Sequence, residues 1–257
     1  MPQSFWIQPQ RIQQKKTIQQ TIRAYEAMEV IDEAKAELES ICPQTVSCSD
    51  IIAFAARDSA FKLGGIRYSI PAGRRDGRVS IKDEPNEHLP PFTLNARELE
   101  ENFAKKGLSL DEMVTFWAHS IGRTHCSSFA DRLYSFNSTH PQDPTMDPRL
   151  AKQLRKRCPN PSNSGVDPTV PLDVVTPNRL DNKYYVNLKN NRGLLTSDQT
   201  LWSSPSTARM VRSNAIHGAN WARNFVAAMV KMGSIEVMSG MQGEIRKNCR
   251  SCELINQ

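Results

Sequence analysis

Two helix-start signals in close succession constrain the fold of this chain more than any other feature. Asn95 is followed three residues later by Glu98, and Ser109 is followed by Glu112 at the same spacing. In such a capping box the first side chain accepts a backbone N–H of the new helix, and the acid reaches back to the N–H of the cap residue. The pattern predicts two short helices in tandem, over residues 95–107 and 109–122.

Apolar residues at intervals of three and four indicate further helices on both sides of this pair. No strong run of alternating apolar and polar residues indicates a strand, so the expected fold class is mostly α with long loops. One apolar stripe consists of Val30, Ile31, Ala34, Leu38 and Ile41, and another of Trp221, Phe225, Ala228, Met229 and Met232. Helices are expected from residue 28 onward and over 49–65, 148–158, 181–191, 205–216 and 219–232, with loops at 65–91, 137–146 and 159–177.

Composition and charge exclude several classes of protein. The chain is 39% hydrophobic and 23% charged, which is typical of a soluble globular protein. No apolar run approaches the roughly 20 residues of a membrane span. The net charge of +6 is spread along the chain without interleaved aromatic residues, which argues against a nucleic-acid partner. The segment 1–27 reads as a helix or a disordered extension and shows no signal-peptide pattern.

The six cysteines leave two interpretations open. They fit disulfides if the chain is secreted and inert thiols if it is not. Cys249 and Cys252 form a single Cys-x-x-Cys with no second pair, which argues against a structural zinc site. The sequon that begins at Asn137 gives weak support to the secretory route. The other cysteines are Cys42, Cys48, Cys126 and Cys158.

Several segments, taken in order, carry a resemblance to a known family. Together they are similar to the secretory (class III) plant haem peroxidases over residues 28–250, which implies the helical fold of the plant-type haem peroxidases. Residues 1–27 then form an unmatched N-terminal extension and residues 251–257 a C-terminal tail. The segments are Val30–Ala56, Ile70–Arg78, Asp111–Phe136, Asp173–Leu188, Gly193–Gln199 and Met229–Arg250.

The resemblance implies a haem b pocket with His119 as the axial iron ligand, placed near the end of the helix 109–122. Asp198 is then the carboxylate that accepts the other N–H of this imidazole, which makes the ligand more electron-rich. His125 falls near a haem propionate, and Pro90 stands where the family has its substrate-access proline. The run that ends in His119 is one residue shorter than the family's Ser-Gly-Ala-His and contains Trp117, which is expected to crowd the haem edge or to reset the start of the helix.

The resemblance also implies a calcium site and two disulfides. Hard oxygen donors suit Ca²⁺, and the implied disulfides are Cys48–Cys249 and Cys126–Cys158. Cys42 and Cys252 are left over, and Asp50 with Arg74 corresponds to a buried structural ion pair of the family. The implied calcium ligands are Ser120, Asp173, Thr176, Asp181 and the carbonyl of Arg179.

The activity implied by the family is H₂O₂-dependent oxidation of small phenolic donors by a secreted or vacuolar monomer. Such an enzyme needs a distal arginine and a distal histidine, within a His-Phe-His-Asp-Cys-Phe run, to cleave peroxide. The 257 residues contain no such run, so the chain resembles a truncated product whose activity is expected to be impaired. The alternative is a non-catalytic haem- or calcium-binding remnant or interaction protein.

Overall fold

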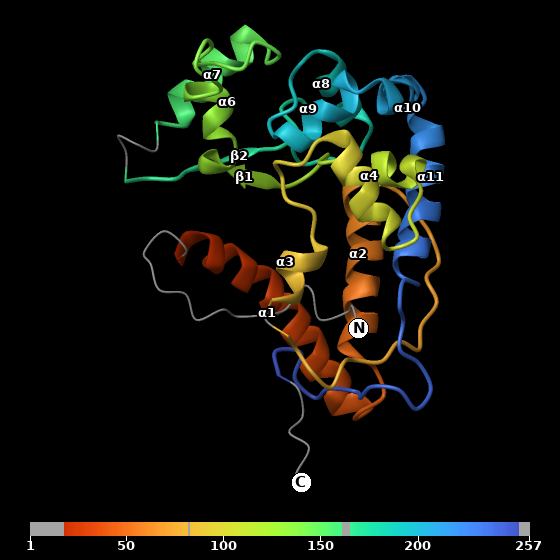
Figure 1. Cartoon of the computed structure of the whole chain (residues 1–257). Coiled ribbons are helices and arrows are strands. Elements are labelled where there is room, and N and C mark those ends of the chain that lie inside the picture. Colours follow the sequence, from red (N-terminus) through yellow and green to blue (C-terminus); the bar gives the residue numbers. More distant parts are fainter. Residues whose placement is uncertain (1–17, 82, 161–164, 252–257) are drawn as a thin grey trace. The chain divides into compact units, whose positions relative to one another are not determined.

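The computed structural model describes residues 18–81, 83–160 and 165–251, and these residues are mostly helical (Figure 1). The mostly α fold class predicted from the sequence is confirmed. The chain forms two compact units, Met1–Leu89 with Val230–Gln257, and Pro90–Met229. The predicted division at residues 27 and 250 stays a prediction, because residues 1–17 and 252–257 lie outside the described part. The leftover Cys252 lies there too.

The first unit contains α1 (Ile18–Ile41), α2 (Cys48–Gly64) and α3 (Glu84–His88). The α1 and α2 helices pack against each other. The hydroxyl of Ser47 accepts the N–H of Asp50 at 3.0 Å and so caps the start of α2. Gly65 ends this helix with a φ of 68°, a left-handed conformation that glycine adopts at little cost. The predicted helix 49–65 is therefore confirmed to within a residue or two.

The α1 helix differs from the sequence prediction in extent and in its buried face. It begins at Ile18, ten residues before the predicted start. Val30 and Ile41 are 62% and 73% exposed, whereas Lys35 is 1% exposed. The ammonium group of Lys35 donates to Glu39 Oε1 and to the carbonyl of Val46, both at 2.6 Å. Because the charge is paired and the aliphatic stem is apolar, the lysine can occupy the buried face.

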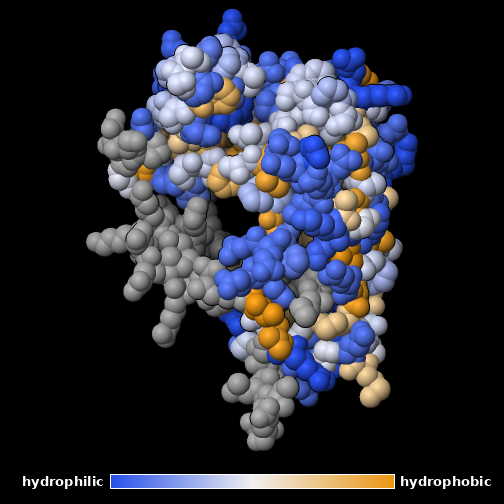
Figure 2. Space-filling view, in the orientation of Figure 1, coloured by the Kyte–Doolittle hydropathy of each residue, from blue (hydrophilic) through white to orange (hydrophobic). Residues whose placement is uncertain are grey.

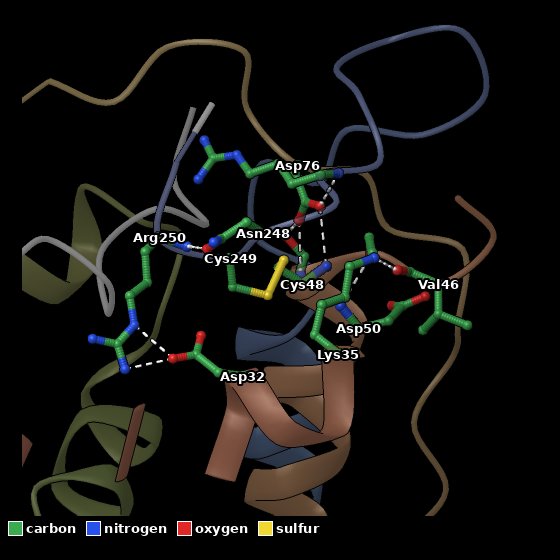
Figure 3. Close-up of a disulfide and its surroundings, with 12 residues drawn as sticks. Asp32, Lys35, Val46, Cys48, Asp50, Asp76, Asn248, Cys249 and Arg250 are labelled. Atoms are coloured by element: carbon green, nitrogen blue, oxygen red, sulfur yellow. Dashed lines mark hydrogen bonds and ion pairs between the residues drawn. A yellow bond between two sulfur atoms is a disulfide. The ribbon is translucent and has the colours of Figure 1, made fainter. Parts of the chain in front are cut away.

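The disulfide Cys48–Cys249 attaches the C-terminal segment to the start of α2 (Figure 3). Beside it, the carboxylate of Asp76 accepts the backbone N–H groups of Cys48 and Arg246, at 3.0 and 3.1 Å. A carboxylate at this position also compensates the positive end of the α2 helix dipole. The first unit is therefore joined covalently and by hydrogen bonds between its two distant pieces of sequence.

Asp50 and Arg74 form the buried ion pair that the resemblance implies. Arg74 Nη1 lies 2.9 Å from Asp50 Oδ1, and Arg74 Nε donates to the carbonyl of Gly233 at 2.8 Å. Asp50 Oδ2 also accepts the N–H of Gly73 at 2.7 Å. Both charges are thus satisfied within the first unit.

The second unit contains one small sheet and most of the helices. In the sheet, β1 pairs with β2 in antiparallel register, with Thr124 opposite Val170. The α10 helix packs against α5, α8 and α9, and α4 packs against α5 and α9. The α11 helix runs across the boundary between the two units. The elements are α4 (Ala96–Ala104), α5 (Leu110–Phe116), β1 (Arg123–His125), η1 (Cys126–Phe129), α6 (Ala130–Tyr134), α7 (Pro148–Arg157), β2 (Thr169–Pro171), α8 (Lys183–Lys189), α9 (Thr196–Ser203), α10 (Pro205–Ile216) and α11 (Gly218–Met232).

Both predicted capping boxes are present, but the second helix is shorter than predicted. The α5 helix ends at Phe116, so His119 lies after the helix and not near its end. The hydroxyl of Tyr185 lies 2.9 and 3.1 Å from the carbonyls of Val114 and Thr115. A donor at this position satisfies carbonyl groups that the last helical turn leaves unpaired, and so stabilises the early helix end. The helices α3, α6 and α9 and both strands were not predicted.

An apolar core in the second unit surrounds the disulfide Cys126–Cys158, the second pairing implied by the resemblance. The sequence segments in this core come from η1, α6, α7, β2 and the loop before α9. On the face drawn in Figure 2, hydrophobic side chains form small separate groups among hydrophilic ones. No helix among the described residues is long and apolar enough to cross a membrane. The core consists of Cys126, Phe129, Leu133, Met146, Leu150, Ala151, Leu154, Cys158, Val170, Leu194 and Leu195.

Candidate functional site

A histidine–carboxylate pair forms the centre of the candidate site in the second unit. His119, after α5, and Asp198, in the first turn of α9, bring Nδ1 and Oδ1 to 2.6 Å. Asp198 is 1% exposed, whereas 30% of the His119 side chain is exposed. The structure therefore brings together His119, which the resemblance implies as the iron ligand, and Asp198, which it implies as the acceptor of the other N–H of this imidazole.

The carboxylate of Asp198 accepts three hydrogen bonds from different elements. Oδ1 accepts the hydroxyl of Tyr184 at 2.9 Å as well as His119, and Oδ2 accepts the N–H of Leu195 at 3.1 Å. The Leu195 bond closes the first turn of α9, because Asp198 reaches back to the residue that precedes the helix. Tyr184 lies on α8, so three segments hold this acid in one orientation.

The charge of Asp198 controls the protonation of its neighbours. Burial lowers the pKa of His119, but the negative charge and the hydrogen bond of Asp198 outweigh burial, so the pKa is raised above its ordinary value. Burial, followed by the same charge, raises the pKa of Tyr184 well above its ordinary value. Tyr184 is therefore a neutral donor, and the Nδ1 proton of His119 faces the carboxylate.

The pair fits the requirements of a haem iron ligand. When Nδ1 of a neutral imidazole carries the proton, the lone pair that binds metal is on Nε2. The partly exposed ring of His119 leaves this nitrogen outside the bond to Asp198. The indole of Trp117 lies 5.4 Å from the imidazole, centroid to centroid, and its Nε1 is buried without a hydrogen-bond partner among the described residues. Aromatic and imidazole rings of this kind suit a flat apolar cofactor.

Three of the side chains predicted to bind calcium, those of Asp173, Thr176 and Asp181, lie together in the second unit. Thr176 Oγ1 lies 3.0 Å from Asp181 Oδ1 and 3.4 Å from Asp173 Oδ2. Ser120, the residue after the candidate iron ligand, donates its hydroxyl to the carbonyl of Asp181 at 2.7 Å. The side chain of Arg179 is exposed, and its Nε lies 3.8 Å from Asp181 Oδ2.

Asp173 is the residue of this cluster whose carboxylate best suits a hard cation. The residue is fully buried, and its Oδ1 accepts the N–H groups of Val175 and Thr176 and an amide N–H of Asn187. Within the described residues, the only hydrogen bond to its Oδ2 is the long one from Thr176, at 3.4 Å. A buried carboxylate oxygen with so little compensation suits an oxygen-liganded cation. Within the described residues no group of three or more His, Cys, Asp or Glu side chains is placed to hold a metal ion, so hydroxyl and carbonyl oxygens would complete the site.

Two further residues predicted for the site, His125 and Pro90, have no hydrogen bond to His119 or Asp198 among the described residues. Nδ1 of His125 is 3.0 Å from the carbonyl of Asp167 and 3.4 Å from its Oδ2. This histidine therefore has a partner of its own, and its predicted place beside a propionate stays a prediction. Pro90 is half-buried in the loop between α3 and α4, and no contact in the structure assigns it to the site.

Tyr184 is the site residue that the sequence reasoning missed. It belongs to the Tyr-Tyr pair inside the segment 173–188, which carried part of the family resemblance. The spacing alone gives no indication that one hydroxyl reaches an acid fourteen residues later.

Comparisons with known proteins identify the family of the chain. The chain matches the sequence profile of a family described as Peroxidase over residues 4–216. It is 52% identical to Peroxidase 5 of Vitis vinifera over 223 residues, which are 86% of this chain and 68% of the relative. It is 47% identical to Peroxidase 2 of Zea mays over 227 residues, 87% of this chain and 66% of the relative.

A third relative, Peroxidase 57 of Arabidopsis thaliana, is 43% identical over 223 residues, 86% of this chain and 69% of the relative. The chain thus spans about two thirds of the length of the relatives it matches. The similarity includes the segments that carry His119 and Asp198, and the resemblance to the plant haem peroxidases is confirmed. The chain is a member of the peroxidase family.

Proposed function

We propose that this chain binds haem b through His119 and belongs to the branch of its family that oxidises small phenols with H₂O₂. The observation that carries the proposal is the 2.6 Å contact between His119 Nδ1 and Asp198 Oδ1, with Asp198 buried and held by two further donors. Bound haem would supply the one-electron redox chemistry. The residues of the chain supply the axial ligand and its orientation.

The role of Asp198 in this proposal follows from simple electrostatics. A short hydrogen bond to a carboxylate increases the electron density of the imidazole and fixes its Nδ1–H tautomer. The ring is then presented with Nε2 ready to bind iron and with its plane held by Asp198. The half-buried Trp117 beside the ring would help to exclude water from a cofactor bound at His119.

We further propose that these 257 residues alone turn over peroxide slowly. Cleavage of the O–O bond needs a base that moves a proton between the two oxygen atoms and a cation that stabilises the departing one. His125 is paired with Asp167, and the sequence holds no His-Phe-His-Asp-Cys-Phe run. In this proposal the chain supplies the axial ligand and its carboxylate partner, and none of these 257 residues is assigned to peroxide activation.

A hemin titration tests the ligand assignment. Adding hemin to the purified chain should produce a Soret band, and His119→Ala should abolish or shift it. His140→Ala, which changes an exposed loop histidine, is the matched control and should leave the band unchanged. If the band is the same in all three proteins, His119 is not the ligand. A guaiacol assay with H₂O₂ on the loaded chain should then give a rate far below that of an intact relative.

A calcium ion is the second proposed cofactor, at Ser120, Asp173, Thr176, Asp181 and the carbonyl of Arg179. The support is the buried Asp173 carboxylate with its weakly compensated Oδ2. Calcium here would connect the residue after His119 to the loop before α8. This observation also supports the second candidate function, a haem- or calcium-binding protein without catalysis.

We propose that the protein is secreted or vacuolar and works as a monomer. The two disulfides suit an oxidising compartment. In the Asn137 sequon, the side-chain oxygen of Asn137 accepts the N–H groups of Thr139 and His140 in an exposed loop, at 3.0 and 2.7 Å. Removing N-glycans from the plant-expressed protein should lower its apparent mass. An unchanged mass in the Asn137→Gln variant and the parent would argue against this route.

A further inference from the structure

A buried guanidinium joins α6 to the segment before α9. Arg132 is 1% exposed, and its Nε donates to Asp143 Oδ2 at 2.8 Å. Asp143 is also buried, so the ion pair has little contact with solvent. The other end of the guanidinium, Nη1, contacts three consecutive backbone carbonyls, those of Gly193, Leu194 and Leu195, at 2.8, 2.6 and 3.1 Å.

Leu195 connects this cation to the candidate site. Its carbonyl accepts from Arg132, and its N–H donates to Asp198 Oδ2 at 3.1 Å. The other oxygen of the same carboxylate lies 2.6 Å from His119 Nδ1. Hydrogen bonds therefore run in series from Arg132 through Leu195 and Asp198 to the imidazole. A shift of the Leu195 backbone would turn the carboxylate away from the histidine.

The three carbonyl oxygens need a cation to stay together. Carbonyl dipoles that converge on one point repel one another, and a positive charge between them offsets the repulsion. Asp143 in turn neutralises the buried guanidinium. Burial alone would raise the pKa of Asp143, but hydrogen bonds from Thr145 and Arg132 outweigh burial and lower it, so the acid stays charged.

Apolar packing already holds the same segments together. Leu194 and Leu195 lie in one buried cluster with Phe129 and Leu133, which flank Arg132 on η1 and α6. Replacing a buried ion pair by apolar side chains often leaves stability unchanged or improves it. The distinctive contribution of Arg132 is therefore the direction that it imposes on the backbone at residues 193–195.

We propose that Arg132 is a positioning residue. Together with Asp143, it keeps the carboxylate of Asp198 within hydrogen-bond distance of His119 Nδ1. The role rests on the proposed function, in which His119 is the iron ligand. The proposed contacts, however, lie entirely within the chain, so they can be tested without any cofactor. Among the described residues Arg132 has no hydrogen bond to His119 or to Asp198, and it acts through the backbone at residues 193–195.

Proton NMR of the histidine-labelled, cofactor-free chain is the test. A short Nδ1–H bond to a carboxylate should give a low-field resonance, which His119→Gln identifies by its loss. Arg132→Met should abolish or shift this resonance, and Arg132→Lys, which keeps a charge and donors, should restore it in part. Arg74→Met is the matched control, because Arg74 is also buried, paired with an aspartate and bonded to carbonyls, but belongs to the other unit.

Each outcome decides the matter. An unchanged resonance in Arg132→Met, its loss in Arg74→Met, or its absence from the unmodified chain overturns the proposal. If Arg132→Met does not fold, the same resonance is recorded for Asp143→Asn, which keeps the guanidinium but removes its charged partner. Loss or shift of the resonance in this variant supports the proposal, and an unchanged resonance overturns it. A chain that passes this test but binds no hemin would refute the proposed function and leave the positioning role intact.

Discussion

Tyr184 donates its hydroxyl to Asp198 Oδ1, the oxygen atom that also lies 2.6 Å from His119 Nδ1. Two donors therefore compete for one atom of the carboxylate. Each bond that Asp198 accepts from Tyr184 lowers the electron density that the carboxylate offers to the imidazole. The tyrosine is thus placed to moderate the basicity of His119 through Asp198, without a hydrogen bond to the imidazole itself.

Removing this competitor should make the imidazole a stronger donor. In the hemin-loaded chain, Tyr184→Phe should lower the Fe(III)/Fe(II) reduction potential on the order of tens of millivolts, since one hydrogen bond is worth about 1 kcal/mol. Spectroelectrochemical titration measures this shift. Tyr185→Phe is the matched control, because the neighbouring hydroxyl contacts the α5 carbonyls and Trp221 but not Asp198. Equal shifts in both variants would contradict the assignment.

The charge of Asp198 should matter for hemin affinity. Asp198→Asn keeps the shape of the side chain and removes the charge, and losses of about 10- to 100-fold are usual when the partner of a metal ligand is changed. The dissociation constant follows from absorbance titration with hemin. Asp58→Asn is the control, because Asp58 is an exposed acid on α2 that pairs with Arg57, and it should leave the affinity within about twofold of the parent chain.

Calcium should stabilise the chain through Asp173. If calcium occupies the proposed site, 100-fold more calcium than its dissociation constant raises the free energy of unfolding by about 2.7 kcal/mol. Asp173→Asn should abolish the difference in melting temperature between calcium and a chelator. The exposed acid Asp131 provides the control, because Asp131→Asn should melt like the parent in both conditions. A calcium response that survives Asp173→Asn would place the ion elsewhere.

Acid should weaken the Arg132–Asp143 pair in a defined direction. The folded-state pKa of Asp143 is lowered, so its contribution to stability is fully present above the unfolded value of about 3.9 and is lost as the pH falls through the folded value. The stability difference between the parent and Asp143→Asn should therefore be largest above about pH 5 and shrink towards pH 3. Urea unfolding at several pH values measures it, and a constant difference would rule out this linkage.

The sequence predicted those elements whose signals are local. The α10 helix was predicted with its observed bounds, and both capping boxes begin helices where the spacing placed them. The α9 helix escaped notice because its cap residue is Leu195, which has no capping oxygen, and the first turn is closed by Asp198 from within. The early end of α5 depends on Tyr185, seventy residues later, which no local pattern reveals.

In the candidate site, too, some residues could be predicted from the sequence and others depend on long-range contacts. His119 and Asp198 were identified through the family resemblance, and the structure places them in contact. Tyr184 and Arg132 were not identified, because each acts through a long-range hydrogen bond that a linear sequence does not display. The buried Lys35 was missed for a related reason, since its partner Val46 lies in the loop after α1. Periodicity assigns charged residues to the surface unless a partner is known.

The bond between Cys48 and Cys249 gives the chain an order of assembly. Residues 90–229 are contiguous, so their unit can fold as soon as it leaves the ribosome. Its companion combines segments on both sides of these residues, so the bond cannot form before Cys249 has been made. Until then the residues before position 90 lack their covalent link to the segment that carries Cys249.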